Sequence, residues 1–285
     1  MEADTAYASC PILLPAVIGT KEPCGEEICQ GGVSGPEKEM PWSNERDFVD
    51  ALERNNTKIL LGGYKTVLKD PLPGEEYNVH IAADMLAGMV VKNGQVFSQN
   101  SAIGPYTKDK GFREGPTYIG TMVTTTIGGG VCKIASALYN TAVLSDMKII
   151  ERHNHTMPVP YVPYGQDATV SYGNKDIRFQ NNSGADIMIW AKGIGNVLYM
   201  AFYGSKPAPD VQWKHQVLQT TKAPFMYKIN PQMCANEKKL LVEGMDGAVV
   251  KSWVTVTSDE SSETRYMGMS KYQPMPHLIE KGPDP

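Results

Sequence analysis

Apolar positions in the first half of the chain recur mainly at helical spacing. They predict a short helix that begins after Ser43, its N-cap, and a second helix from Asn78 to the Asn93-Gly94 pair. A third helix is predicted to follow Cys132. The apolar residues that mark these three helices are Phe48, Ala51 and Leu52, then Ile81, Met85 and Met89, and finally Ile134, Leu138 and Ala142.

Other stretches favour strands because β-branched and aromatic residues alternate there between turn sequences. Strands are predicted at 58–67, 117–126, 168–172, 177–180, 187–191 and 197–203. The last four form an antiparallel meander in this interpretation. Early helices followed by a late sheet predict an α+β fold.

Composition changes along the chain suggest three segments. Residues 1–57 form an irregular arm with a short helix, and residues 58–205 form the α+β domain. A Pro-rich linker at 206–210 then leads to residues 211–285, a small all-β module with strands expected at 240–242, 249–257 and 263–269.

Charge and hydropathy exclude some functions. The 285 residues carry 27 basic and 31 acidic side chains, a net charge of −4 with no basic run, so nucleic acid is not an expected partner. No apolar stretch approaches the roughly 18 residues that a membrane span needs. Glu2 and Asp4 do not fit the basic start of a signal peptide, so no export signal is expected in this sequence.

Five cysteines leave at least one unpaired if the others form disulfides. Cys132 is the natural candidate for the free thiol. Cys24 could pair with Cys29, or one of the two with Cys10, and Cys234 is expected to be structural or paired with the N-terminal arm. Zinc binding by Cys24 and Cys29 would require further ligands that do not accompany them.

The strongest chemical signal is the run of three glycines that ends at Gly130, just before Cys132. Glycines permit a sharp turn, and the following pattern places Cys132 at a helix start. Unpaired N–H groups and the helix dipole there favour a thiolate. A small buried cysteine beside an ordinary turn is the structural alternative.

Histidines and an aspartate downstream add the partners of a nucleophile. The order Cys132, His155, Asp167 suits attack, proton transfer and orientation of the base. His153 is a second candidate base, and an Asx turn is the structural alternative for Asp167. A zinc site at Cys132, His153 and His155 is the rival chemistry; otherwise no cofactor is expected.

Several motifs in register resemble the VanW family. They are Phe97-Ser98-Gln99-Asn100, the GGGVCK turn, Leu138-Tyr139-Asn140, the ERHNH segment, Tyr161-Val162-Pro163 and GQDATVSYG. The resemblance covers about 58–204. It implies an exported cell-envelope protein, typical of Gram-positive bacteria and of vancomycin-resistance gene clusters. The chain has Lys133 where the family usually has glutamine; a lysine could still stabilise an oxyanion.

The tail resembles the small cell-wall module named for five glycines, which often follows a VanW domain. The resemblance implies binding of amino-sugar polymers. Trp253, Tyr266 and Tyr272 are the expected contacts because sugar rings stack on aromatic faces. Trp253 could instead be the core residue of the module.

These observations lead to two functional hypotheses. The first is a cysteine-dependent acyl hydrolase or transferase that acts on peptidoglycan peptides or a related amide, with an oxyanion held by N–H groups of Val131 to Lys133. The second is a non-catalytic peptidoglycan-binding protein of cell-wall remodelling or glycopeptide resistance. Both place the protein outside the cell or in the envelope. The residues expected to bind substrate are Gly129, Gly130, Lys133, Tyr139, His153 and Trp253.

Overall fold

The computed structural model describes residues 33–68, 71–119, 122–259 and 261–283. Its described part has two compact units. Among the described residues, the larger unit combines residues 33–223 with Met245–Met275, and the smaller includes Pro224–Gly244 and residues 276–283. The boundary between these units does not coincide with the linker predicted at 206–210. The division of the chain into three segments remains a prediction.

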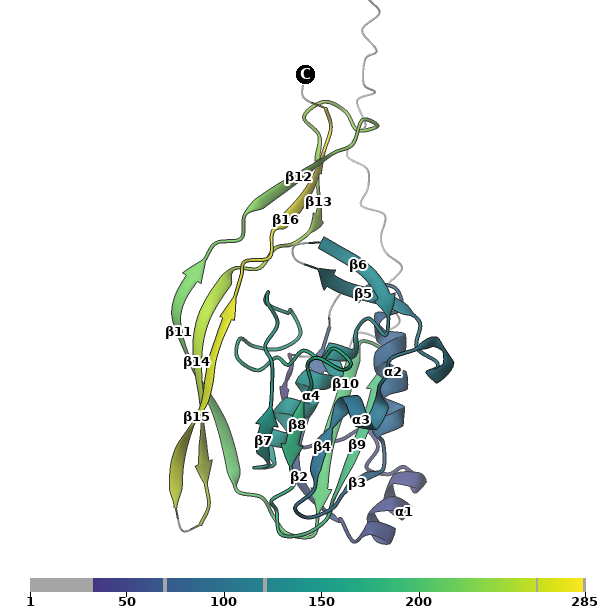
Figure 1. Ribbon diagram of the computed structural model, residues 1–285, viewed down its shortest axis with the longest axis vertical. Coiled ribbons are helices and arrows are strands. Elements are labelled where there is room, and N and C mark those ends of the chain that lie inside the picture. Colours follow the sequence, from purple (N-terminus) through teal and green to yellow (C-terminus); the bar gives the residue numbers. More distant parts are fainter. Residues whose placement is uncertain (1–32, 69–70, 120–121, 260, 284–285) are drawn as a thin grey trace, which may run out of the picture. The chain divides into compact units, whose positions relative to one another are not determined.

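A five-stranded antiparallel sheet is the centre of the larger unit (Figure 1). The last two strands of the predicted meander pair as a hairpin in this sheet, but its strand at 177–180 belongs to another sheet, so the four-strand meander is wrong. The strands, in spatial order, are β1 (Gly35–Pro36), β2 (Ile59–Val67), β10 (Val197–Gly204), β9 (Ile187–Ile194) and β3 (Met89–Val91).

Both faces of this sheet are covered by apolar side chains. On β10, Leu198, Met200 and Phe202 belong to the main core, which includes residues of α2 (Glu75–Leu86) and α4 (Val131–Leu144). The alternate residues Ala201 and Tyr203 pack with Trp42 and with Phe48 of α1 (Arg46–Asn55). The period of two along β10 therefore separates two apolar clusters.

Three smaller sheets complete the larger unit. One contains β4 (Val96–Ser98), β8 (Arg178–Gln180) and β7 (Lys148–Glu151) in that order, and the short helix α3 (Gln99–Ile103) follows β4. The others are the β5–β6 hairpin (Glu114–Ile119 and Met122–Ile127) and the sheet β11 (Asp210–Thr221), β14 (Gly247–Thr257) and β15 (Ser262–Tyr272).

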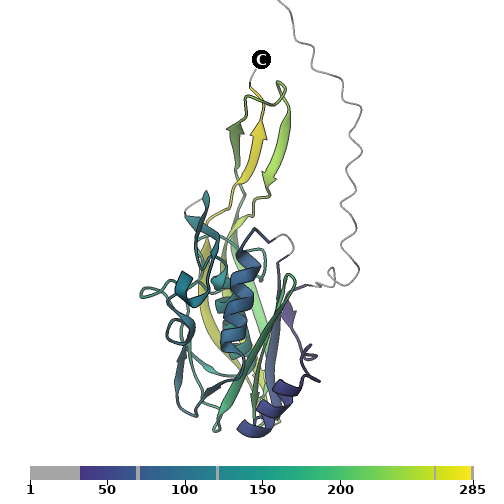
Figure 2. The same cartoon turned by 90° about the vertical axis from the view of Figure 1, so that its right-hand side faces the viewer.

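The smaller unit is a single layer of three strands (Figure 2). Its order is β12 (Phe225–Ile229), β16 (His277–Lys281) and β13 (Lys238–Val242), with β12 parallel and β13 antiparallel to β16. Cys234 is disulfide-bonded. The predictions for Cys10, Cys24, Cys29 and the first residues of the chain lie outside the described residues.

The α+β class is correct, with several antiparallel sheets, but some predicted elements differ. The helix expected to continue to Asn93 ends at Leu86, because Gly88 adopts a positive φ and residues 89–91 pair with β9 instead. The strand expected at 117–126 is a hairpin. Residues 168–172 make only an isolated bridge, and Ser43 does not cap α1, whose N-cap is Glu45.

Candidate functional site

The triple glycine forms the turn that joins β6 to α4. Gly128 and Gly130 have φ values of 79° and 101°, which side chains rarely tolerate. A Cβ at Gly129 would lie 2.2 Å from the backbone of Gly115. The turn thus needs glycine at each position, and it delivers Cys132 to the first turn of α4.

Asn78 on α2 fixes this turn against the β5–β6 hairpin. Its amide donates to the carbonyl groups of Gly129, at 2.8 Å, and Arg113, at 2.9 Å, and its oxygen accepts from the N–H of Arg113. The side chain is fully buried, so all three bonds lie in a region of low dielectric. Three separate elements therefore hold the turn that carries the cysteine.

Cys132 is half-buried and its thiol is free. Its sulfur lies 3.4 Å from the hydroxyl of Thr169 and 3.7 Å from the carbonyl oxygen of Val170. His155 lines the same cavity as Cys132 and lies close enough to affect the charge of this sulfur. The structure thus brings the cysteine and this histidine to one place.

Asp167 fixes the position of His155. One carboxylate oxygen accepts from the backbone N–H of His155 at 2.6 Å and bonds its Nδ1 at 2.7 Å. Because Nδ1 is occupied, Nε2 is the ring nitrogen left for the thiol. Cys132, His155 and Asp167 therefore lie in the spatial order that a nucleophile, a base and an orienting carboxylate would need.

Two further side chains hold the carboxylate itself. Arg152 contacts the other carboxylate oxygen at 2.9 Å and donates through Nε to the backbone carbonyl of Asp167 at 2.7 Å. The phenol of Tyr272 donates to the same carboxylate oxygen and accepts from the N–H of Gly165 at 2.8 Å. Asp167 is 1% exposed, so these donors replace the water that it lacks.

Cys132, His155 and Asp167 shift one another's pKa values toward the charged forms. Burial favours the neutral thiol, but the hydrogen bond and the charge of His155 outweigh it and lower the pKa of Cys132. Burial likewise opposes the imidazolium, yet Asp167 and Cys132 raise the pKa of His155 to about 9. The pKa of Asp167 is lowered despite burial, mainly by His155. Both shifts favour the thiolate–imidazolium form of the pair over the neutral form.

Cys132 and His155 open into a cavity of about 640 Å³. Its walls include the glycine turn, and the predicted substrate-contact residues Gly129 and Gly130 are among them. Further walls come from the Pro105–Thr107 loop, the β5–β6 hairpin, Tyr161 and the 169–175 segment. The volume lies within the range of roughly 300–1,000 Å³ typical of small-ligand pockets.

The other predicted contact residues do not line this cavity. Lys133 is buried and bonds Glu76 at 2.7 Å and the carbonyl of Asn196 at 3.0 Å, so it cannot serve an oxyanion. Strand β7 ends at Glu151, so His153 and His155 do not share a strand face. His153 bonds Glu151 at 3.0 Å. Tyr139 faces a different cavity, and Trp253 packs against Tyr266 at a ring distance of 5.7 Å.

The expected oxyanion donors also need correction. Val131 and Lys133 donate their backbone N–H groups to Gly128 and Gly130. Within the described residues, the N–H groups of Gly130 and Cys132 find no backbone or side-chain acceptor. The free donors at this helix start are therefore those of Gly130 and Cys132.

The described residues do not provide the geometry that a zinc site at Cys132, His153 and His155 would need. They contain no group of three or more histidine, cysteine, aspartate or glutamate side chains arranged to hold a metal ion. His153 bonds Glu151, while His155 is engaged by Asp167. No described helix combines the length and apolar character that crossing a membrane requires.

Sequence reasoning missed Arg152 and Tyr272. Arg152 does not pair with its neighbour Glu151, which contacts His153 and Arg178. Tyr272 was expected to contact sugar, but it is buried. Arg152 lies in the same ERHNH segment as His155, three residues before it, and this proximity was a signal for Arg152. No local pattern indicated Tyr272.

The fold and the site define an α+β domain in which a cysteine, a histidine and an aspartate meet at one cavity. A family model described as VanW like protein matches residues 74–203, which include all three. The match covers less than half of the chain, and within it this segment is similar to the VanW family.

Two relatives match over this region. The protein YoaR of Bacillus subtilis (strain 168), described as uncharacterized, is 35% identical over 173 residues, which are 60% of this chain and 57% of YoaR. The vancomycin B-type resistance protein VanW of Enterococcus faecalis (strain ATCC 700802 / V583) is 30% identical over 119 residues, 40% of this chain and 43% of that protein. The chain thus spans about half the length of each relative.

Two solved structures match the tail at a low level. They are the crystal structure of HP0197-G5, 16% identical over 26% of this chain and 99% of that chain, and the IgA1 protease G5 domain, 22% identical over 29% and 100%. Both comparisons have a TM-score of 0.16, which supports no statement about the fold or function of the tail.

Proposed function

We propose that the VanW-like domain is a cysteine-dependent acyl hydrolase or transferase that acts on an amide of the cell wall, in an exported or envelope-associated protein. The single observation that carries this proposal is that Cys132 and His155 line one cavity, with Nδ1 of His155 held by Asp167. This arrangement supplies a nucleophile, a proton carrier and a fixed ring orientation.

The first half of the reaction forms a thioester. The Cys132 sulfur attacks the amide carbonyl carbon, and the carbonyl oxygen gains the negative charge. The free N–H groups of Gly130 and Cys132 are the groups that face this charge. As the C–N bond breaks, the imidazolium of His155 gives its proton to the leaving nitrogen, and an amine departs.

The second half releases the acyl group. His155 is now neutral and takes a proton from water or from an acceptor amine, which attacks the thioester carbonyl. The C–S bond breaks and the thiolate returns beside the imidazolium. Water gives a free acid, whereas an amine gives a new amide, so one site accommodates both outcomes.

Peptidoglycan is proposed as the substrate because of the relatives. One of them is named as a vancomycin resistance protein, and the resemblance to the VanW family implies a cell-envelope protein. The cavity is lined mainly by glycine, proline, threonine and tyrosine residues rather than by clustered charge, which suits uncharged amide groups.

The test is to incubate the full chain with purified Gram-positive sacculi and to identify the products by mass spectrometry. We expect muropeptides in which one amide is cleaved or exchanged, and none with Cys132→Ala. Asp167→Asn should lower the rate strongly because it leaves His155 without its carboxylate partner. Equal products from Cys132→Ala would refute catalysis by this thiol.

A second candidate is a non-catalytic wall-binding protein. It is favoured by the single-layer sheet of the smaller unit, where every residue of β12 is exposed, including Phe225 and Tyr227. Exposed aromatic rings can stack on sugars. If Phe225→Ala with Tyr227→Ala abolishes sedimentation with insoluble peptidoglycan while Cys132→Ala has no effect on any product, binding is the function.

A further inference from the structure

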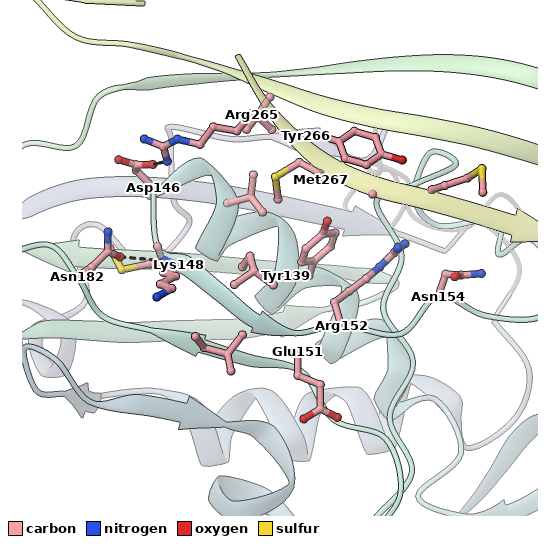
Figure 3. Close-up of a pocket in the computed structure, with 17 residues that line it drawn as sticks. Tyr139, Asp146, Lys148, Glu151, Arg152, Asn154, Asn182, Arg265, Tyr266 and Met267 are labelled. Atoms are coloured by element: carbon pink, nitrogen blue, oxygen red, sulfur yellow. Dashed lines mark hydrogen bonds and ion pairs between the residues drawn. The ribbon is translucent and has the colours of Figure 1, made fainter. Parts of the chain in front are cut away.

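A cavity between β7 and β15 provides a comparison for the Cys132 cavity. It has a volume of about 660 Å³ and shares no lining residue with the Cys132 cavity. Both carboxylates that line it are ion-paired. Asp146 lies beside Arg265, as Figure 3 shows. Glu151 contacts Arg178. The Cys132 cavity, in contrast, is lined by a carboxylate that lacks a cation among the described residues.

This carboxylate belongs to Glu75, the first residue of α2. The residue lines the Cys132 cavity and is only 9% exposed. Its Oε2 accepts from the backbone N–H of Leu72 at 3.2 Å, whereas Oε1 has neither a hydrogen bond nor an ion pair within the described residues. The protein does not close off Oε1, so this oxygen is accessible from the cavity that Glu75 lines.

The described lysines near Glu75 do not pair with it. Lys133 is buried close by, but its Nζ bonds Glu76 at 2.7 Å and the carbonyl of Asn196 at 3.0 Å. Lys175 lines the same cavity without forming an ion pair with Glu75. Burial raises the pKa of Glu75, and the charge of Glu76 acts in the same direction. A cation supplied by a ligand would therefore stabilise the ionised carboxylate.

The glycine turn places Glu75 next to the groups proposed to react. A Cβ at Gly130 would lie 3.0 Å from Cγ of Glu75, so the two residues are in contact. Gly130 precedes Cys132 by two residues, and its N–H is one of the two free donors at this helix start. A group paired with Glu75 therefore lies near a carbonyl that is held at Cys132.

A structural role at the helix start accounts for only part of these contacts. Acidic side chains in the first turn stabilise a helix, and the bond from Leu72 fixes the chain that enters α2. This role uses Oε2 and does not require burial. It does not account for an unpaired Oε1 in the cavity of Cys132.

We propose that Glu75 binds a primary ammonium group of the substrate, so that the preferred substrates are amides that carry such a group close to the scissile bond. This inference rests on the proposed reaction of Cys132. The ammonium donates to Oε1 of Glu75 while the amide carbonyl lies at the thiol. An ammonium has three donors and a full charge, and it replaces the water that a buried carboxylate lacks. Glu75 positions the substrate and takes no part in proton transfer.

The probes are alkylating reagents of different charge, with the Cys132 thiol of the full chain as the reporter. 2-Bromoethylamine carries a primary ammonium, (2-bromoethyl)trimethylammonium carries a cation without N–H donors, and iodoacetamide is neutral. Mass spectrometry of the Cys132 peptide gives each rate at neutral pH relative to that of iodoacetamide. We expect Glu75→Gln to lower the relative rate of 2-bromoethylamine roughly tenfold, the lower end for a hydrogen bond to a charged group. The trimethylammonium reagent should lose less.

Glu114→Gln is the matched control. Glu114 lies next to the start of α2, since a Cβ at Gly74 would meet its carbonyl oxygen, but its side chain is exposed and does not line the cavity. This variant removes a nearby charge of the same sign and should leave the relative rates unchanged. Circular dichroism shows whether each variant is folded. Wild type alone gives a second measurement: it should favour 2-bromoethylamine over the trimethylammonium reagent more than a small free thiol does.

The proposal is overturned if Glu75→Gln keeps the wild-type relative rates, if both cationic reagents lose equally, or if Glu114→Gln has the same effect. It is also overturned if wild type shows no more preference for 2-bromoethylamine than a free thiol does. These outcomes are separate from catalysis. Equal products from wild type and Cys132→Ala in the sacculus assay refute the reaction, whereas the alkylation rates test the ammonium site even where no product forms.

Discussion

The phenol of Tyr272 on β15 donates a hydrogen bond to the carboxylate of Asp167, 105 residues earlier in the chain. Ser270, on the same strand, accepts from Arg152 at 2.8 Å, and Arg152 holds the same carboxylate. The segment that matches the VanW family ends at residue 203. A strand outside that segment therefore completes the environment of the proposed catalytic aspartate.

Tyr272→Phe should destabilise the protein because it removes the hydroxyl that Asp167 and Gly165 share. A hydrogen bond to a charged, buried group contributes about 1.5–3 kcal/mol, so a loss of this size in the free energy of unfolding is expected from urea titration. Tyr266→Phe is the control, since Tyr266 is 56% exposed and its hydroxyl has no hydrogen-bond partner in the described residues. Equal losses in both variants would contradict the assignment.

The Cys132 thiol should react with iodoacetamide below the pH at which ordinary thiols react. Its lowered pKa means that the thiolate forms at a lower pH than in an ordinary thiol and is lost as the pH falls through that pKa. Alkylation of the Cys132 peptide, followed by mass spectrometry from pH 5 to 9, measures this midpoint.

His155→Gln should move the midpoint of alkylation upward, because it removes the imidazolium that favours the thiolate. His153→Gln is the matched control and should leave the midpoint unchanged, since His153 bonds Glu151. A wild-type midpoint at or above about 8.5, the ordinary thiol value, is incompatible with the ion pair.

The pH dependence of stability should reveal the same pair. Between pH 6.5 and about 9 the folded protein keeps the His155 proton that the unfolded chain has lost, which alone would lower stability as the pH rises. Folded Cys132 loses its proton at a lower pH than the unfolded thiol, which keeps its proton up to about pH 8.5. The effects of the two groups on stability therefore oppose each other.

Cys132→Ser removes only the thiol side of this balance. Asp167 still raises the pKa of His155, so the variant should lose stability relative to wild type as the pH rises above about 6.5. Thermal unfolding of both proteins at several pH values measures the difference. Adding His155→Gln to the variant should abolish it, and parallel curves for wild type and Cys132→Ser would rule out the coupled pair.

Local sequence patterns predicted the cysteine turn and helix α4, because triple glycine and helical periodicity act over a few residues. They also predicted the order of Cys132, His155 and Asp167, though not their contact. Arg152 and Tyr272 depend on pairing between distant strands, which no local period records. The predicted end of α2 was wrong because the apolar residues 89–91 suit a helix as well as a strand. Their pairing with β9 places them in a strand.

Lys133 should contribute to stability and not to the reactivity of Cys132. Its side chain is fully buried against Glu76, so Lys133→Ala leaves a carboxylate without its partner and should cost about 3–5 kcal/mol of unfolding free energy. Lys133→Gln, the residue usual in the family, retains an N–H donor for Glu76 and should cost less.

The matched control for Lys133 is Lys58→Ala. Its ion pair with Glu53 has the same 2.7 Å separation but is more than half exposed, so its loss should change stability by less than about 1 kcal/mol. In all three variants the alkylation midpoint of Cys132 should stay at the wild-type value, because Lys133 does not line the cavity. A shift of that midpoint in Lys133→Gln would show that the lysine charge reaches the thiolate, and would return Lys133 to the proposed site.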